Sequence, residues 1–422
     1  MAERSQPEVI LSATLWWPAS ARLAMAFRSA GCRVSAVCPD GHPLRAVSGI
    51  EAIHPYRGSC PTRSLESALR AAQADLVVPC DDGAAWHLHD LWARSAEFRP
   101  LIERSLGPAE NYSTLEGRVP TMQAASELGI CVPRTETVAT ADEVDASGLG
   151  WPAVLKIDGT WGGEGVAIVH DRQEARDAFG ALLGAAGNAR AWRRFLLNRH
   201  PLALWLSRRR KKSPILVQSF VAGRQATSMF ACWKGEVLAN VAVEVLLSRG
   251  PTGVADVVRV IDNREMESAA RLLAKRFKLS GLHGLDFVIE DGTEAPYLIE
   301  MNARATQLGH LNVCAKGNLA DALAARVTGT EMRPAHGARR ISSDTIAHFP
   351  AAWKADPANP LLVTGFHDVP WEQPALVREL ILDPWPERRL LSRILGGVWR
   401  RRPRGASSAG SRGGKDQWPL AG

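Results

Sequence analysis

An apolar hairpin interrupted by three polar side chains is the feature that most constrains the fold of this chain. The stretch "LDFVIEDGTEAPYLIEMNAR" (residues 285–304) predicts two strands joined by a turn at Asp291-Gly292. Side chains two residues apart on a strand point the same way, so Glu300 and Asn302 share a face. Asp286 can point to that same face from the paired strand.

These three oxygen-bearing side chains predict a cation site. Mg²⁺ prefers a few carboxylates, completed by waters and by the phosphates of a substrate. The alternative is a polar, solvent-facing side of an ordinary hairpin. The neighbouring residues are strongly apolar, so the polar groups interrupt a buried pattern, which favours the metal interpretation. We therefore expect Asp286, Glu300 and Asn302 to hold Mg²⁺ or Mn²⁺.

A second predicted hairpin, "AVLKIDGTWGGEGVAIV" (residues 153–169), carries a glycine-rich turn. It is not a P-loop, because Lys156 precedes the glycines and no Gly-Lys-Ser/Thr follows them. It is not a dinucleotide fingerprint either, because the glycines lead into a strand instead of a helix. Two interpretations stay open on this pattern alone. One is an ordinary glycine turn; the other is a loop whose N–H groups cover a phosphate above Lys156.

Residues 8–110 alternate apolar strands with amphipathic helices, which predicts a parallel sheet with helices on its faces. The third predicted strand, 75–82, ends in Asp81 and Asp82. These carboxylates could bind a ligand at the carboxyl edge of the sheet, or cap the following helix. His87 and His89 are interpreted as structural, because no third metal ligand accompanies them.

The remaining chain shows a helix that begins near residue 113 and closes at Gly129, and a hairpin around Lys234-Gly235. A helix is also expected over 268–281. Residues 331–398 give no interpretable pattern. The expected division of the chain is 1–110, 111–222, 223–330, 331–398 and a disordered basic tail, 399–422.

In their order along the chain these motifs resemble the ATP-grasp superfamily. The resemblance covers residues 8 to about 330 and depends on four features. They are the βαβ region followed by "RVPTMQAASELGICVP", then "VLKIDGTWGGEGV", "ILVQSFVAGRQ" and "DFVIE…YLIEMNAR". It implies an α/β fold: an N-terminal parallel-sheet, Rossmann-like domain followed by a two-lobed α+β ATP-grasp domain.

The resemblance also implies roles for particular residues. Lys156 would contact the phosphates of ATP, and Glu300 would bridge the metal ions. Arg304 would face the transferred phosphate or a substrate carboxylate, which makes it and Lys156 the catalytic candidates. The other implied nucleotide contacts are Arg118, Gly162, Gly163, Gly165, Gln218, Ser219, Phe220, Val221 and Gln225.

Three of these positions depart from the family pattern. Arg118 stands where the family often has Lys, Ser219 where it often has Glu, and Gln225 where a ribose-binding carboxylate is usual. The activity implied most often is ATP-dependent joining of a carboxylate to an amine through an acyl phosphate. Two alternatives stay open: a phosphotransferase that stops at a phosphorylated product, and a degenerate nucleotide-binding protein with a regulatory role.

The charge and the cysteine content limit which kinds of partner and which cellular compartment are expected for this chain. The net charge is +7, but residues 400–422 carry six basic residues against Asp416, so the tail accounts for +5 and the remainder for +2. We therefore expect no nucleic-acid partner, while the small-molecule carboxylate and amine substrates are what the resemblance implies. No apolar run is long enough to span a bilayer, and seven scattered cysteines are typical of the cytoplasm. The basic segment 189–213 leaves a lid, a homodimer contact and an interfacial helix open.

Overall fold

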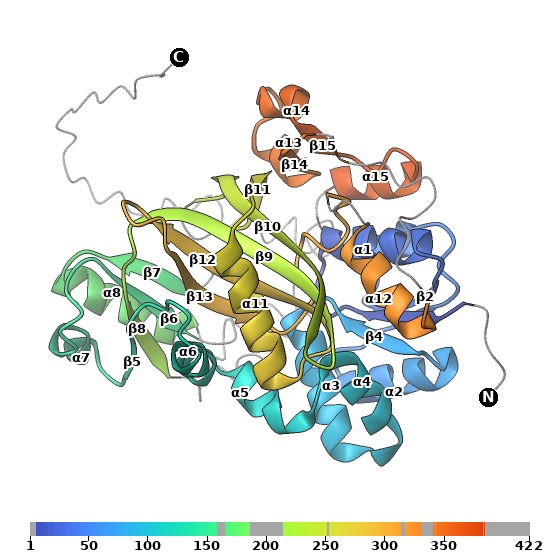
Figure 1. The fold of residues 1–422 in the computed structure, drawn as a ribbon, viewed down its shortest axis with the longest axis horizontal. Helices are drawn as coiled ribbons and strands as arrows, with labels where there is room; N and C mark the ends of the chain where they lie inside the picture. The colour runs from blue at the N-terminus through green and yellow to red at the C-terminus, as the bar shows by residue number, and fades with distance from the viewer. Residues whose placement is uncertain are drawn as a thin grey trace, which may run out of the picture.

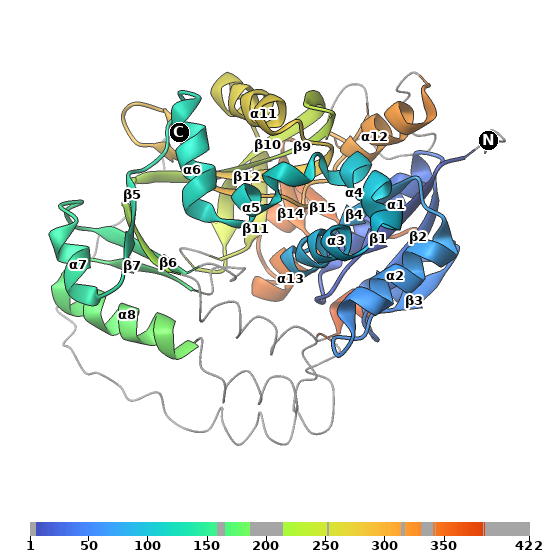
Figure 2. The same cartoon turned by 90° about the horizontal axis from the view of Figure 1, so that it is seen from below.

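A computed structural model describes residues 6–157, 165–185, 214–250, 253–313, 317–330, 341, 343–382 and 384. Gly162, Gly163, the segment 189–213 and the basic tail lie outside these residues. The described chain forms three sheets. In Figures 1 and 2 the largest sheet lies between the two smaller ones, with the N-terminal sheet on one side of it.

The N-terminal sheet is parallel, with strand order β3-β2-β1-β4, as the alternating pattern predicts. The three predicted strands are present, and the sequence missed β3 because it is only three residues long and reads Ile-His-Pro. The elements are β1 (Glu8–Ser12), α1 (Pro18–Ser29), β2 (Arg33–Cys38), η1 (Pro43–Ala46), β3 (Ile53–Pro55), α2 (Pro61–Ala72), β4 (Leu76–Pro79), α3 (Asp82–Arg94), η2 (Ala96–Phe98), α4 (Arg99–Leu106) and η3 (Ala109–Asn111).

The single helix expected after residue 113 is instead two helices, α5 (Tyr112–Glu116) and α6 (Arg118–Glu127). The break lies at Gly117, whose backbone is extended. Pro120 has no N–H to bond the carbonyl of Glu116, so the first helix cannot continue through it. Gly129 follows α6 with a φ of +77°, a left-handed conformation that ends the helix as predicted.

The second four-stranded sheet contains the glycine hairpin. Its strand order is β5-β8-β6-β7, and β6 pairs antiparallel with β7, which confirms the predicted strand–turn–strand. The helix α8 packs against β6 and β7. The elements are β5 (Thr135–Val138), α7 (Ala141–Ala146), β6 (Ala153–Ile157), β7 (Val166–Val169), α8 (Arg172–Ala185) and β8 (Ile215–Ser219).

The largest sheet has seven strands in the order β13-β12-β9-β10-β11-β14-β15. The two hairpins predicted here, β9–β10 and β12–β13, are confirmed. Lys234 and Gly235 form the turn between β9 and β10, with φ angles of +50° and +88°. The elements are β9 (Gly223–Trp233), β10 (Glu236–Ser248), β11 (Ala255–Val260), α11 (Arg264–Phe277), β12 (Gly281–Glu290), β13 (Pro296–Asn302) and α12 (Leu319–Thr328).

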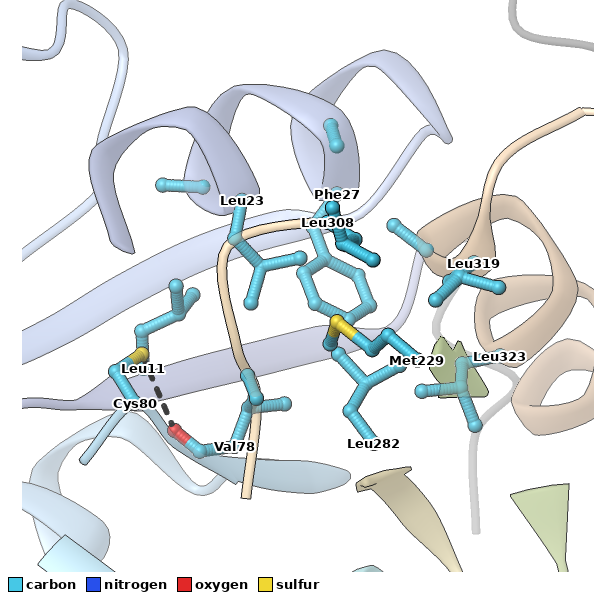
Figure 3. Close-up of a cluster of buried hydrophobic side chains, with 14 of the residues drawn as sticks. Leu11, Leu23, Phe27, Val78, Cys80, Met229, Leu282, Leu308, Leu319 and Leu323 are labelled. Carbon is cyan, nitrogen blue, oxygen red and sulfur yellow. Dashed lines mark hydrogen bonds between the residues drawn. The ribbon is translucent and has the colours of Figure 1, made fainter. Parts of the chain in front are cut away.

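The two faces of this sheet are covered differently. The helix α11 packs on one face through Met266, Leu273 and Phe277. The other face packs on the N-terminal sheet: Met229 and Leu282 contact a shared core with residues from β1, β4, α1 and α12 (Figure 3). The N-terminal sheet is thereby fixed against the face of β12 that carries Leu282 and, four residues later, Asp286.

The segment after residue 330, for which the sequence shows no interpretable pattern, adds two strands to the seven-stranded sheet. The strand β14 pairs antiparallel with β11, and β15 pairs parallel with β14. Asp368 at the end of β15 accepts hydrogen bonds from Arg22 of α1 and from His310, whose Nε2 lies 2.6 Å away. The elements are β14 (Thr345–His348), α13 (Ala351–Ala355), α14 (Leu361–Thr364), β15 (Phe366–Asp368) and α15 (Pro374–Ile381).

Buried histidines make the fold sensitive to acid. Burial lowers the pKa of His42 to about 3 and the pKa values of His283 and His348 to about 4. These side chains are neutral in the folded protein but bind protons near pH 6.5 when it unfolds. Their stabilisation is therefore complete above about pH 6.5 and is lost as the pH falls towards 4.

We expect the free energy of unfolding to fall by about 1 kcal/mol per pH unit for each of these histidines in that window. Urea unfolding followed by tryptophan fluorescence at pH 7, 6 and 5 measures this dependence. His283→Gln should make the dependence shallower, because it removes one of the groups. A stability that does not change between pH 7 and 5 would contradict the prediction.

Candidate functional site

Polar side chains line up across three strands of the large sheet. Asp286 lies directly opposite Glu300 on β13 and opposite Thr227 on β9. Asn302 donates a hydrogen bond from Nδ2 to Asp286 Oδ2 at 2.9 Å. The structure therefore brings together the three side chains that the sequence analysis placed on one face, and Asn302 is buried there.

The pKa values of the two carboxylates, Asp286 and Glu300, are shifted in opposite directions. Burial, and then repulsion from Glu300, raises the pKa of Asp286. Burial alone would also raise the pKa of Glu300, but the charges of Arg118 and Lys156 outweigh it and lower that pKa. Two mutually repelling carboxylates beside an amide oxygen suit a hard divalent cation. No group of three or more His, Cys, Asp or Glu side chains suited to a metal occurs in the described part of the chain, so Asn302 would have to supply the third protein ligand.

Two cations reach Glu300 from outside the large sheet. Arg118 donates from Nη2 to Glu300 Oε1 at 2.7 Å and from Nη1 to the carbonyl oxygen of Ile157 at 3.1 Å. Lys156 is 6% exposed, and its Nζ lies 3.4 Å from the carbonyl oxygen of Ile299. The guanidinium thus bridges the glycine hairpin and the metal-candidate strand. Lys156 and Arg118 place two positive charges beside the carboxylates.

Arg304 is fixed against the N-terminal domain. Its Nε donates to Asp82 Oδ1 at 2.7 Å, and the adjacent Ala305 N–H bonds the carbonyl oxygen of Pro79 at 3.0 Å. Burial would lower the pKa of Arg304, but Asp82 and Glu300 outweigh it and raise the pKa, so the side chain stays charged.

The two carboxylates at the end of β4 serve different purposes. Asp81 accepts hydrogen bonds from the N–H of Ala84 at 2.9 Å and from the hydroxyl and N–H of Thr14. It therefore caps α3 and anchors the loop after β1, which supports the structural interpretation. Asp82, one residue later, points to Arg304 and lies at the candidate site.

The predicted hinge follows β8. Gln218 is buried and donates from Nε2 to Thr135 Oγ1 at 2.9 Å, so its side chain is held by β5. The Ser219 N–H bonds the carbonyl oxygen of Arg134. Phe220 is 38% exposed and Val221 is half-buried, while Gln225 lies opposite Val288 on β12. Of the three glycines proposed to cover phosphates, Gly165 alone is described, and its φ is +81°.

A cavity that the sequence analysis did not foresee lies beside Glu300. One face of α3 forms a wall of the cavity. The lining residues of this helix are Asp82, Ala85, Trp86 and His89, whose spacings of three, four and seven residues place them on one side of a helix. The α5–α6 junction and the end of β13 complete the cavity. Its polar or aromatic lining residues include Asp82, Trp86, His89, Glu116, Arg118 and Glu300. Such a cavity leaves no local sequence signal, because three separate segments build it.

In this fold two cations, Lys156 of β6 and Arg118 of α6, lie beside the carboxylates of β12 and β13. Residues 199–307 match a sequence family described as "ATP-grasp domain". This match, together with the fold shared with solved structures, confirms the resemblance and the predicted α/β architecture. The domain boundaries stay predictions.

Solved structures share this fold at low sequence identity. N5-carboxyaminoimidazole synthetase from Staphylococcus aureus, complexed with ADP, is 14% identical, with a TM-score of 0.56 over 78% of this chain and 79% of that one. L-amino acid ligase from Bacillus licheniformis is 16% identical, with a TM-score of 0.56 over 78% and 79%. A biotin carboxylase–nucleotide complex from Campylobacter jejuni is 14% identical, with a TM-score of 0.56 over 80% and 74%. Curated protein sequences gave no match. Among the described helices, none has the length and apolar character needed to cross a membrane.

Proposed function

We propose that this chain is an ATP-dependent ligase that activates a carboxylate as an acyl phosphate for attack by an amine. The observation that carries the proposal is the meeting of Arg118 and Lys156 with Asp286, Glu300 and Asn302 at the boundary of the two lobes. Phosphoryl transfer needs charge neutralisation and positioning more than covalent chemistry by the protein, and this cluster offers both.

Each residue of the cluster has a role that follows from its charge and position. Lys156 and Arg118 would bind phosphate oxygens of ATP below the glycine hairpin. Arg304 would face the transferred phosphoryl group or the carboxylate that receives it. Asp286, Glu300 and Asn302 fit Mg²⁺, which would neutralise phosphate charge during the transfer. Because Arg118 bonds Glu300 here, it would have to share its guanidinium between that carboxylate and a phosphate.

The proposal is tested by supplying ATP, Mg²⁺, hydroxylamine and single carboxylic acids from a panel of amino acids and small acids. An acid that becomes an acyl phosphate gives a hydroxamate and ADP. A second screen then pairs this acid with amines from the same panel and measures phosphate release. Release that requires both substrates supports the ligase. ADP formation without any hydroxamate favours the phosphotransferase alternative, and tight ATP binding without turnover favours a regulatory nucleotide-binding protein.

Lys156→Ala should weaken ATP binding about tenfold or more, because one charged hydrogen bond contributes roughly 1.5–3 kcal/mol. Isothermal titration calorimetry measures the effect, and thermal unfolding checks that the fold is intact. Lys234→Ala is a matched control, since this lysine lies in the turn between β9 and β10. Unchanged ATP affinity in Lys156→Ala would remove the lysine from the nucleotide site.

A further inference from the structure

The cavity beside Glu300 contains a histidine held in a defined orientation. His89 Nδ1 lies 2.7 Å from Glu116 Oε1, and the side chains are 9% and 21% exposed. The imidazole also stacks on Tyr112, with ring centroids 3.9 Å apart and planes 11° apart. A carboxylate on one ring nitrogen fixes the tautomer and leaves the other nitrogen as the acceptor. Among the described residues, none bonds His89 Nε2.

The lining of the cavity is carboxylate and apolar beside the imidazole. Among the described residues, the charged ones that line the cavity with His89 are Glu116 on α5, Arg118 on α6, Glu300 on β13 and Asp82 on its own helix. Arg304 bonds Asp82 and Arg118 bonds Glu300, so the negative charge that lies directly against the imidazole is that of Glu116. Trp86 adds an aromatic ring, which also attracts cations, and Leu115 and Met301 add apolar surface. An alkylammonium ion matches this combination of negative charge and apolar wall.

We propose that this cavity binds the amine substrate as its ammonium ion, and that His89 is the general base that deprotonates it. The proposal depends on the ligase function proposed above and names the second substrate class of the same site. The cavity is placed for this, because Glu300 and Arg118 belong both to its wall and to the predicted phosphate site. An amine bound here would lie next to the acyl phosphate.

The step balances as follows. His89 Nε2 accepts one proton from the ammonium ion, and Glu116 stabilises the imidazolium that forms. The freed nitrogen lone pair makes the C–N bond to the acyl carbon, and the C–O bond to the phosphoryl group breaks with its electron pair on phosphate. The nitrogen loses a second proton to the departing phosphate, which leaves as HPO₄²⁻. The third proton stays on the amide, and the imidazolium returns its proton to water.

Hydroxylamine separates this step from acid activation. It is largely uncharged at neutral pH, so it can attack the acyl phosphate without a base. His89→Gln should therefore lower ligation of the selected amine about 100-fold at pH 7, the size expected for loss of a general base, and leave hydroxamate formation nearly unchanged. The deficit should narrow as the pH rises, because the amine then deprotonates in solution.

Two further variants make the test specific. Glu116→Gln keeps an oxygen that can accept from His89 but loses the charge that stabilises the imidazolium, so it should lower amine ligation about tenfold and spare hydroxamate formation. His87→Gln is the control: His87 is buried two residues earlier, lies 2.9 Å from the Tyr56 hydroxyl, and is not part of the cavity wall. Thermal unfolding of each variant shows whether the fold is kept.

The possible results separate the role of His89, the role of the cavity and the ligase function from one another. Equal loss of ligation and hydroxamate formation in His89→Gln, or no loss of either, would overturn the assignment of His89. A wild-type protein that forms hydroxamate but joins no ammonium-type amine would overturn the cavity assignment and leave the activation step standing. A wild-type protein that forms no hydroxamate with any acid would instead count against the ligase function itself.

Discussion

Glu300→Gln should lower turnover about 100-fold or more and weaken ATP binding much less. The substitution keeps the shape of the side chain and an oxygen that can still accept from Arg118. It removes the negative charge that balances Arg118 and Lys156 and that a cation would need beside Asp286. The loss should therefore fall on the charged transition state of phosphoryl transfer and fall less on ground-state binding.

Hydroxamate formation with the selected acid measures turnover, and calorimetry measures ATP affinity in the same variant. Glu290→Gln is the matched control, because Glu290 ends β12 and hydrogen-bonds Thr293 away from the site. Asp286→Asn should resemble Glu300→Gln if both carboxylates hold the cation. Full turnover in Glu300→Gln would remove the metal assignment.

The parts of this site that could be predicted leave their signal within one stretch of sequence. Asp286, Glu300 and Asn302 interrupt two apolar strands joined by a short turn, so strand periodicity alone puts them on one face. The glycine hairpin was predictable for the same reason, and so was the βαβ rhythm of the N-terminal domain. In the two hairpins the pattern and the contacts that it predicts lie close together in the chain.

What could not be predicted depends on contacts between distant segments. The bond from Arg118 to Glu300 spans 182 residues, and the bond from Arg304 to Asp82 spans 222. The sequence showed each charge but not its partner. The contact of His89 with Glu116 could not be predicted either, because it depends on the helix break at Gly117. The strands β14 and β15 have only four and three residues, too few for periodicity to show.

Arg304→Gln should lower phosphoryl transfer about 10³-fold, the effect expected when a guanidinium that stabilises the transferred phosphoryl group is lost. Arg304→Lys should recover part of this loss, because it restores the charge but not the planar pair of donors. Hydroxylamine serves as the nucleophile, so that changes in amine binding do not enter the measurement.

The bond to Asp82 allows a structural role of Arg304 to be separated from a chemical one. If this arginine only ties the segment after β13 to α3, Asp82→Asn breaks the same contact and should reduce hydroxamate formation and thermal stability as much as Arg304→Gln does. If it stabilises the transferred phosphoryl group, Asp82→Asn leaves a charged guanidinium beside Glu300 and should reduce activity far less. Equal losses in the two variants would therefore assign Arg304 to the architecture and remove it from the chemistry.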